Sequence, residues 1–281
     1  MSTQTTVLVT GATGNVGRHV VNRLLELGAD VRALVREPGA ARLPAGVAVA
    51  GGDLTRPDTL DAALAGVDSV FLVWPGLSTA AAPATVERLS EYARRLVYLS
   101  AMGGRDGERP AGFWGDIEGL IERTGLESTF LRASGFAANT LGWAEQIRTR
   151  GVVRWPYGHA RRSLVHEKDL AAVAALALTE DRHVGAAYTL TGPEAVSQLE
   201  QVRLIGTAID RDLRWEEQPR AEARESLLAA WGDPAFVDMA LNGWAAMIDA
   251  PEPVTRTVEQ VTGVPARKFR QWALDHAADF R

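Results

Sequence analysis

Short apolar runs rich in β-branched residues alternate with longer amphipathic segments through the first half of the chain. The short runs are typical of buried strands, and the longer segments repeat their apolar positions at helical spacing. Strands are predicted at Val7–Thr10, Val31–Val35, Val47–Ala50, Ser69–Val73, Leu96–Ser100 and Ser128–Leu131. Because strands alternate with helices, we expect a parallel sheet covered by helices on both faces.

The intervening segments predict helices at Asn15–Leu27, Pro57–Ala65, Pro83–Arg94, Gly112–Thr124 and Phe136–Arg148. Gly28, Gly66 and Gly125 close three of these helices. Each lies where a left-handed cap is commonly needed. We therefore expect all three glycines to end helices.

The pattern changes after Arg150. Gly, Trp, Pro and Tyr gather in Gly151–His159, which predicts a loop. The pattern then predicts a helix at Lys168–Leu178, a strand at Ala187–Leu190, a helix at Ser197–Ile209, a strand at Leu213–Glu216 and mostly helices over Pro219–Arg281, with breaks at Pro251, Pro253 and Pro265. We expect a doubly wound α/β (Rossmann) domain at residues 1–150. A smaller, mostly helical lobe at residues 151–281 is expected to intertwine with it in one compact unit, over the carboxyl edge of the sheet.

Three glycines spaced three apart follow the first strand: Gly11, Gly14 and Gly17. Gly11 permits a tight turn, Gly14 lets the backbone approach a phosphate, and Gly17 lets the helix pack against the strand. The N–H groups and the dipole at the start of that helix favour an anion. A bare structural turn is the alternative, but the strand–turn–helix context favours binding of a dinucleotide pyrophosphate.

Arg36, at the end of the second strand, suits the 2′-phosphate of NADP, and Arg18 could assist it. Glu37 next to Arg36 weakens this assignment, and a solvated surface arginine is the alternative. Asp53 could lie near the adenine or form an Asx turn. NADP(H) is thus preferred over NAD(H). The glycine turn and the ends of the second and third strands thus predict cofactor contacts at Gly11, Gly14, Gly17, Arg36 and Asp53.

Composition narrows the remaining function classes. The 281 residues carry a net charge of −5, which disfavours nucleic-acid binding. No cysteine is present, which excludes disulfides, thiol nucleophiles and cysteine-ligated metals, and no pair of histidines has ligand spacing, so no metal site is predicted. Met1–Thr6 is polar, and no apolar run of about 18 residues offers a membrane span. We expect a cytoplasmic protein with a small-molecule substrate and allow for a homodimer.

The glycine turn Thr10–Gly17 resembles the nucleotide fingerprint of atypical short-chain dehydrogenases, particularly the NmrA-like group. Further segments resemble that group in the same order: Val97–Ser100, Glu118–Gly125, Thr129–Arg132, Phe136–Asn139, Asp169–Ala171, Leu190–Pro193 and Gly263–Arg267. The glycine motif is widely shared, whereas the ordered set of later segments is more specific. The resemblance covers nearly the whole chain and implies binding of NAD(P). It adds further predicted cofactor contacts at Thr13, Asn15, Val16, Leu54, Val73, Trp74, Pro75 and Ser100.

Typical short-chain dehydrogenases use a Tyr four residues before a Lys, because the lysine lowers the pKa of the tyrosine. Lys168 and Lys268 are the only lysines here, and Leu164 and Val264 stand four residues before them. Many NmrA-like reductases carry instead a Lys or His four residues before the equivalent of Glu118. Trp114 occupies that position, and an indole cannot perform acid–base catalysis.

The resemblance leaves Ser100 and Asp116 as polar candidates for the catalytic site, and strand-end capping and solvated helix surface are their alternatives. His166 resembles part of a family loop, but a structural histidine is favoured. A pocket for a flat, aromatic or quinone-like molecule is predicted, with core packing as the alternative for its aromatic members. Its predicted lining is Trp74, Met102, Phe113, Trp114, Phe136, Asn139 and Trp143.

Three functions remain open at this point. The first is an NAD(P)H-dependent oxidoreductase acting on a small aromatic, quinone or enone without the Tyr/Lys pair. The second is a non-catalytic NAD(P)-sensing regulatory protein. The third is a cofactor-binding enzyme that performs cyclisation, isomerisation or epimerisation.

Overall fold

The structure is a computed structural model that describes residues 5–103 and 107–281, so most of the polar amino-terminal segment lies outside it. The chain divides into two compact units. Unit 1 comprises 1–133, 167–190 and 257–264, and unit 2 comprises 134–166, 191–256 and 265–281. Residue 150, the expected boundary, lies within unit 2, because the chain leaves unit 1 at residue 133 and returns to it twice.

Unit 1 is built on a seven-stranded sheet in which every neighbouring pair is parallel. The strands are β1 (Thr6–Thr10), β2 (Asp30–Val35), β3 (Ala48–Gly51), β4 (Ser69–Leu72), β5 (Arg95–Ala101), β6 (Glu127–Ala133) and β9 (Ala187–Leu190). Their order is β3-β2-β1-β4-β5-β6-β9. The order reverses between β1 and β4, which is where open α/β sheets bind ligands. The predicted α/β fold is confirmed.

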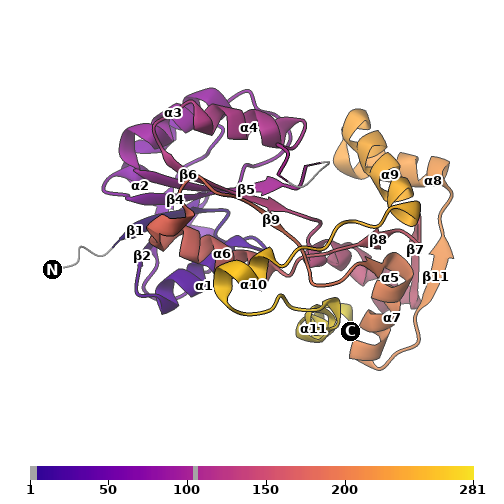
Figure 1. Cartoon of the computed structure of the whole chain (residues 1–281). Helices are drawn as coiled ribbons and strands as arrows, with labels where there is room; N and C mark the ends of the chain where they lie inside the picture. The colour runs from indigo at the N-terminus through magenta and orange to yellow at the C-terminus, as the bar shows by residue number, and fades with distance from the viewer. Residues whose placement is uncertain (1–4, 104–106) are drawn as a thin grey trace. The chain divides into compact units, whose positions relative to one another are not determined.

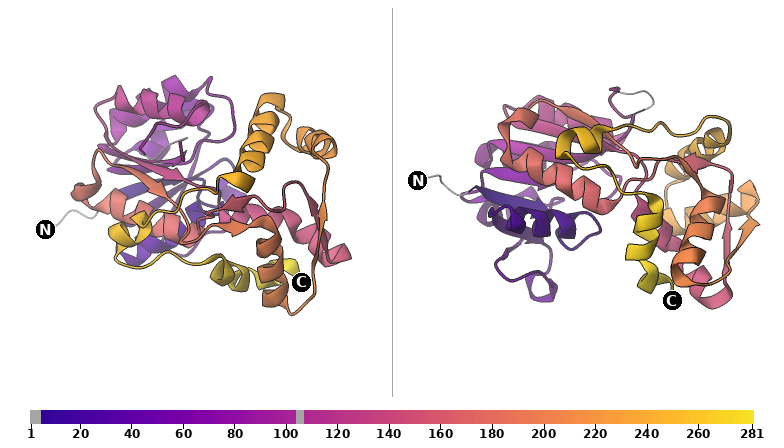
Figure 2. Two further views of the ribbon diagram at one scale, coloured as in Figure 1. Left: turned by 45° about the vertical axis from the view of Figure 1, so that its right-hand side comes forward. Right: turned by 60° about the horizontal axis from the view of Figure 1, so that its bottom comes forward.

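Helices cover both faces of this sheet (Figures 1 and 2). α3 (Ala82–Tyr92) and α4 (Phe113–Glu122) lie on one face, and α1 (Gly17–Glu26) and α6 (Glu167–Thr179) lie on the other. α10 (Thr257–Thr262) packs beside α6. Apolar side chains fill both interfaces, for instance Leu8, Leu72 and Leu96 toward the α3 and α4 side. Burial of these side chains supplies the main driving force for this architecture.

Two details of the expected helices in unit 1 are wrong. The segment predicted as a helix over Pro57–Ala65 is a 3₁₀ turn, Pro57–Thr59, followed by the single-turn helix α2 (Asp61–Leu64). The Thr59 hydroxyl donates to the Arg56 carbonyl oxygen at 2.7 Å, a local bond that competes with helix formation. Gly28 and Gly66 have positive φ, as expected for helix-ending glycines. Gly125 does not, and the residue that caps the end of α4 is instead Arg123, whose backbone has right-handed helical φ and ψ.

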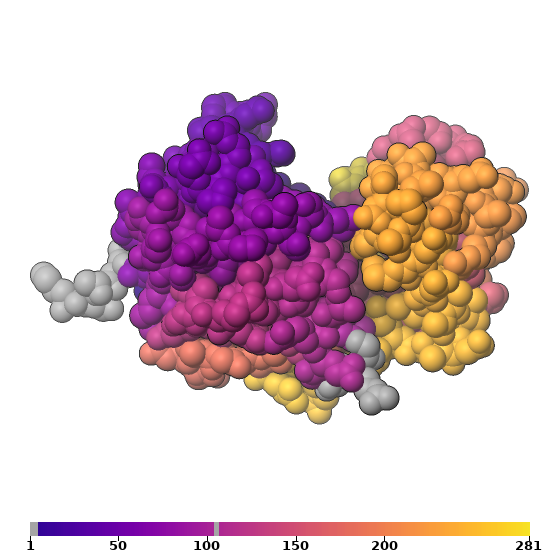
Figure 3. All heavy atoms as spheres, turned by 90° about the horizontal axis from the view of Figure 1, so that it is seen from above, coloured from indigo at the N-terminus to yellow at the C-terminus, as the bar shows by residue number. Residues whose placement is uncertain are grey.

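Unit 2 combines helices with two small sheets. Its helices are α5 (Ala144–Arg150), α7 (Gln198–Ile209), α8 (Arg220–Trp231), α9 (Pro234–Asp249) and α11 (Phe269–Asp275), with 3₁₀ helices at Ala137–Trp143 and Ala277–Phe280. β8 (Arg161–Arg162) pairs with β10 (Val196–Ser197), and β7 (Val152–Trp155) pairs with β11 (Arg214–Glu217). α8 and α9, orange in Figure 3, leave Met239 and Ile248 exposed. This unit is mostly helical, as expected.

Two predictions in unit 2 need correction. Residues 151–159 are not all loop, because β7 forms there by parallel pairing with β11, a partner distant in sequence. The helix predicted over Phe136–Arg148 begins as the 3₁₀ helix Ala137–Trp143 and becomes α5 only at Ala144. Within that 3₁₀ helix the Thr140 hydroxyl donates to the Ala137 carbonyl oxygen at 2.6 Å, which competes with α-helical bonding.

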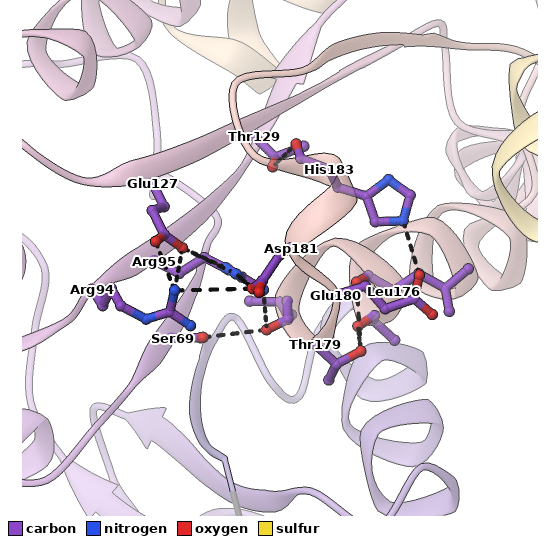
Figure 4. A network of polar contacts seen from close by, with 12 residues as sticks. Ser69, Arg94, Arg95, Glu127, Thr129, Leu176, Thr179, Glu180, Asp181 and His183 are labelled. Atoms are coloured by element: carbon purple, nitrogen blue, oxygen red, sulfur yellow. Dashed lines mark hydrogen bonds and ion pairs between the residues drawn. The ribbon is translucent and has the colours of Figure 1, made fainter.

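A buried arginine holds together the amino-terminal ends of β5 and β6 (Figure 4). Arg95 is 1% exposed, and its Nη2 lies 3.0 Å from Glu127 Oε2 and also contacts Asp181. Arg94 Nη1 donates to the same Glu127 carboxylate at 2.6 Å. Two carboxylates therefore compensate the buried guanidinium at the edge of the sheet opposite the glycine turn.

Candidate functional site

The glycine turn after β1 brings the start of α1 against the end of the strand. A Cβ atom at Gly17 would lie 2.1 Å from the Gly11 carbonyl oxygen, which no real side chain tolerates. Gly11 itself has φ +61°, and the Gly14 N–H donates to its carbonyl oxygen at 2.9 Å. The turn therefore depends on glycine at positions 11 and 17.

The amino terminus of α1 suits an anion. Thr13, Gly14 and Asn15 are exposed, whereas Val16 and Gly17 are buried. Within the described residues, no side chain caps this helix end. Free N–H groups at an uncapped helix end favour a phosphate. The residues present thus fit the pyrophosphate of a dinucleotide.

A side-chain bond joins this turn to the end of β4. The buried Thr10 hydroxyl accepts a hydrogen bond from the Val73 N–H at 2.8 Å. A Cβ at Gly11 would also lie 3.4 Å from the Val73 Cβ. The segment 73–75 is thereby held beside the turn, at the reversal of strand order. Within it Val73 is half-buried and Pro75 is exposed.

Two arginines line a hollow of about 350 Å³ beyond the ends of β2 and β3. Arg36 follows β2, Arg56 follows β3, and Gly51, Gly52 and Asp53 lie between them. Arg56 Nη2 is 3.6 Å from Asp58 Oδ2, but both side chains are exposed, so the ion pair contributes little. Arg36 was predicted from the sequence as a cofactor contact and Arg56 was not, because only the pairing of β2 with β3 brings the two segments together. A phosphate contact by either arginine stays a prediction.

Asp53 adopts the Asx turn that was the alternative to an adenine contact. Its Oδ1 accepts the Thr55 N–H and the Thr55 hydroxyl, each at 2.8 Å. These bonds, together with the charges of Arg36 and Arg56, lower the pKa of Asp53. Leu54, another predicted cofactor contact, is buried in the core, so its side chain already has a structural role. A cofactor contact by either residue stays a prediction.

Ser100 lies at the carboxyl end of β5 and belongs to a buried polar group. Its Oγ donates to Glu118 Oε1 at 2.7 Å. Arg132 binds the same carboxylate through Nε at 3.1 Å and through Nη2 at 2.7 Å, the latter to Oε2. Arg132 Nη1 also donates to the Gly107 carbonyl oxygen at 2.8 Å. Glu118 is 0% exposed, so its charge is compensated inside the fold.

Tyr98 lies two residues before Ser100 on the same strand. Its side chain is fully buried, and its hydroxyl has no hydrogen-bond partner among the described residues. Burial, together with the nearby charge of Glu118, raises the pKa of Tyr98 far above its ordinary value. Tyr98 is therefore a neutral core residue and cannot substitute for the missing catalytic tyrosine.

The other predicted site residues of unit 1 differ in exposure. Trp74 is 7% exposed and its Nε1 donates to the Ser78 carbonyl oxygen at 2.8 Å, so it is largely core. Phe113 and Trp114 are half-buried with ring centroids 4.0 Å apart, and Phe113 packs against the core. Asp116 is exposed in the first turn of α4. Their roles toward a ligand remain predictions.

Met102 is half-buried, and its N–H donates to the Ala133 carbonyl oxygen at 2.8 Å, which extends the pairing of β5 with β6. Three further predicted pocket residues belong to unit 2. There Phe136 is half-buried, Asn139 is exposed, and Trp143 is buried among Trp155 and other core side chains. A pocket formed by this set stays a prediction.

A family model described as NAD(P)H-binding matches residues 11–181, which spans the glycine turn and most of unit 1. The chain belongs to the NAD(P)H-binding family. The resemblance to NmrA-like proteins is thereby confirmed, and binding of NAD(P)H is the property that the family shares.

Two relatives of this NAD(P)H-binding protein match nearly end to end. A (4-alkanoyl-5-oxo-2,5-dihydrofuran-3-yl)methyl phosphate reductase from Streptomyces griseus is 39% identical over 98% of this chain and 99% of its own. An NAD(P)H azoreductase from Xenophilus azovorans is 36% identical, again over 98% of this chain and 99% of its own.

Solved structures of the same fold include an NADPH-dependent quinone oxidoreductase from Escherichia coli in complex with NADPH. It matches with a TM-score of 0.77 at 21% identity, over 95% of this chain and 98% of its own. A Citrobacter triphenylmethane reductase in complex with NADP(H) matches with a TM-score of 0.78 at 20% identity, over 96% and 99%. At these identities the likeness concerns the fold alone.

Within residues 5–103 and 107–281, no helix is long and apolar enough to span a bilayer. The same residues contain no group of three or more histidines and carboxylates placed to hold a metal ion. At the carboxyl edge of the sheet, unit 1 presents the glycine turn, the hollow lined by Arg36 and Arg56, and the buried group around Ser100.

Proposed function

We propose that this protein is an NADPH-preferring reductase whose substrate is a flat conjugated acceptor of the quinone type. The observation that carries the proposal is the close approach at Gly17, which sets the uncapped start of α1 against the turn after β1. That arrangement suits a dinucleotide pyrophosphate. Relatives named as reductases, which match over 98% of this chain, support a redox role for the bound cofactor.

NAD(P)H supplies a hydride when it is bound. A quinone takes up that hydride together with one proton from the medium and leaves as the hydroquinone, while the cofactor leaves oxidised. Such an acceptor suits a chain that lacks the Tyr/Lys pair, because positioning and exclusion of water carry most of a hydride transfer. The half-buried rings of Phe113 and Trp114 offer an aromatic surface to it.

The preference for NADPH rests on Arg36 and Arg56. Both line one hollow next to Gly51 and Gly52, where backbone can approach a ligand closely. Guanidinium groups bind phosphate through charge-assisted hydrogen bonds that a ribose hydroxyl cannot match. Asp53 adds one negative charge to the same hollow, so the two arginines leave an excess of positive charge among these three side chains.

Arg36→Ala and Arg56→Ala are each expected to weaken NADPH binding about tenfold, because each removes a charge-assisted bond to the phosphate. NADH binding should change far less. Calorimetric titration of both cofactors measures the effect. Arg23→Ala is the matched control, because Arg23 is an exposed arginine that pairs with Glu26 at the far end of α1. An equal loss of affinity for NADPH and for NADH would refute the claim that these arginines bind the 2′-phosphate.

A non-catalytic NAD(P)-sensing role is the second candidate. It is favoured by Trp114, which occupies the position of the acid found in many NmrA-like reductases. The two candidates separate in one assay. A reductase consumes NADPH when a quinone or an azo compound is added, whereas a sensor binds NADPH with the same affinity and leaves it reduced.

A further inference from the structure

The hydroxyl of Ser100 has its proton committed inside the protein. A serine hydroxyl offers one donor and two acceptor lone pairs. Here the donor is directed to Glu118 Oε1 at 2.7 Å. Both oxygens of the Glu118 carboxyl group also accept hydrogen bonds from the Arg132 guanidinium. Ser100 is left with lone pairs and no free proton.

Three elements fix this arrangement. Ser100 and Arg132 are paired residues of the neighbouring strands β5 and β6. Glu118 comes from α4, which packs on both strands (Figure 1). All three side chains are at most 7% exposed, so water competes little for these bonds. Low dielectric also strengthens a satisfied charged network.

The register of the sheet places Ser100 at the ligand-binding edge. Leu72 of β4 pairs with Tyr98 of β5, so Ser100 lies level with residue 74, just past the end of β4. Residue 73 is in turn bound to Thr10 at the end of β1. The hydroxyl of Ser100 therefore lies one strand away from the reversal point at which α/β sheets bind ligands.

We infer that Ser100 is a hydrogen-bond acceptor for the carboxamide N–H of the nicotinamide and not an acid toward the substrate, with Glu118 and Arg132 as its positioning residues. This inference rests on the proposed function, since it requires a nicotinamide cofactor at this edge. Of the two roles predicted for Ser100, cofactor contact and catalytic residue, this inference assigns the first. The reduced substrate then takes its proton from the medium.

The carboxamide can be tested directly with the acetylpyridine analogue of NADP⁺, in which a methyl group replaces the carboxamide nitrogen. Wild-type protein should bind NADP⁺ about fivefold more tightly than this analogue, the typical worth of one neutral hydrogen bond. Ser100→Ala should bind the two equally. Ser69→Ala is the matched control: Ser69 is a buried serine of β4 that donates to the Leu178 carbonyl oxygen, and its loss should leave the fivefold preference intact.

The positioning role of Glu118 is tested by the same comparison between NADP⁺ and its acetylpyridine analogue. Glu118→Gln can present an amide N–H to Ser100 and release the serine proton, so the preference for NADP⁺ should fall below twofold. Because that change leaves Arg132 buried without its counter-charge, Glu118→Asp serves as a second variant. It keeps a carboxylate for Arg132 but withdraws it from Ser100, and the preference should fall likewise. Thermal unfolding identifies which variants are folded.

Steady-state kinetics of Ser100→Ala distinguish a hydrogen-bond acceptor for the cofactor from a general acid toward the substrate. With Ser100→Ala, kcat at saturating NADPH should stay within about threefold of wild type while the cofactor KM rises. Loss of a general acid would instead lower kcat by about a hundredfold or more. Such a fall in kcat, or an unchanged preference for NADP⁺ in Ser100→Ala, overturns the inference. Failure of the wild-type protein to bind NADP⁺ overturns the proposed function as well, so the two failures are distinguishable.

Discussion

A single missing methyl group at Gly17 decides whether α1 can lie against the turn after β1. The Gly11 carbonyl oxygen occupies the space that a Cβ would need, and this atom belongs to the backbone, which cannot move aside cheaply. Gly11, with its positive φ, is restricted for a different reason, since only its conformation excludes other residues. Gly17 is thus required for a close backbone approach, and Gly11 is required for its positive φ.

Gly17→Ala should therefore both destabilise the protein by about 1–3 kcal/mol and weaken NADPH binding, because the helix must move away from the turn. Thermal unfolding and calorimetric titration measure the two effects. Gly125→Ala provides the control: its Cβ meets no atom within 4 Å, and its φ is ordinary. An unchanged melting temperature and affinity in Gly17→Ala would contradict the close approach.

Removal of the buried Tyr98 hydroxyl is expected to stabilise the protein, in contrast to the substitution of Gly17. No described residue bonds to it, so the folded protein loses the hydration of this group without compensation. Tyr98→Phe should raise the free energy of unfolding by about 1 kcal/mol, as measured by urea denaturation. Loss of stability would mean that a buried water or another group bonds the hydroxyl.

Acid stability depends on how the ends of β5 and β6 are joined. Burial opposes ionisation of Glu127, but hydrogen bonds from Arg95 and Arg94 outweigh it and lower its pKa. A hydrogen bond from Arg95 likewise lowers the pKa of Asp181. Carboxyl groups with lowered pKa stabilise the fold above their unfolded-state pKa, and this contribution is lost as pH falls through the folded-state pKa.

Replacement of the buried Arg95 should make the stability of the protein depend less on pH in the acid range. The wild-type urea midpoint is expected to fall between about pH 5 and about pH 2, whereas Arg95→Met should be less stable at pH 7 and lose less on acidification. Arg88→Met, which breaks exposed pairs with Asp61 and Glu91, is the control and should follow the wild-type curve. Parallel acid curves for Arg95→Met and wild type would refute the assignment.

The same elements show what a sequence can predict. The central strands β1, β4, β5 and β6 were predictable because each is a local, largely apolar run that is mostly buried. β7 was missed because Gly151, Pro156 and Gly158 surround it with residues typical of turns and because its partner β11 lies far along the chain. Arg56 and the bond from Ser100 to Glu118 were missed for the same reason, since both depend on contacts between separate elements.

For the molecule as a whole, the family and the fold agree with a bound nicotinamide cofactor, and the residues that carry the proposed chemistry all belong to unit 1. Unit 1 supplies the glycine turn, the arginine hollow and the buried group around Ser100. Substrate selection by Phe136, Asn139 and Trp143 of unit 2 stays a prediction. The central claim is narrower: NADPH binds at unit 1 and gives up its hydride.

Loss of the 340 nm absorbance of NADPH on addition of a quinone tests that claim most directly, with an azo compound assayed in parallel. The proposed function predicts consumption of NADPH in step with hydroquinone formation, faster than with NADH at equal low concentration. Tight binding of NADPH that stays fully reduced in the presence of both acceptors would contradict it and favour the sensing role.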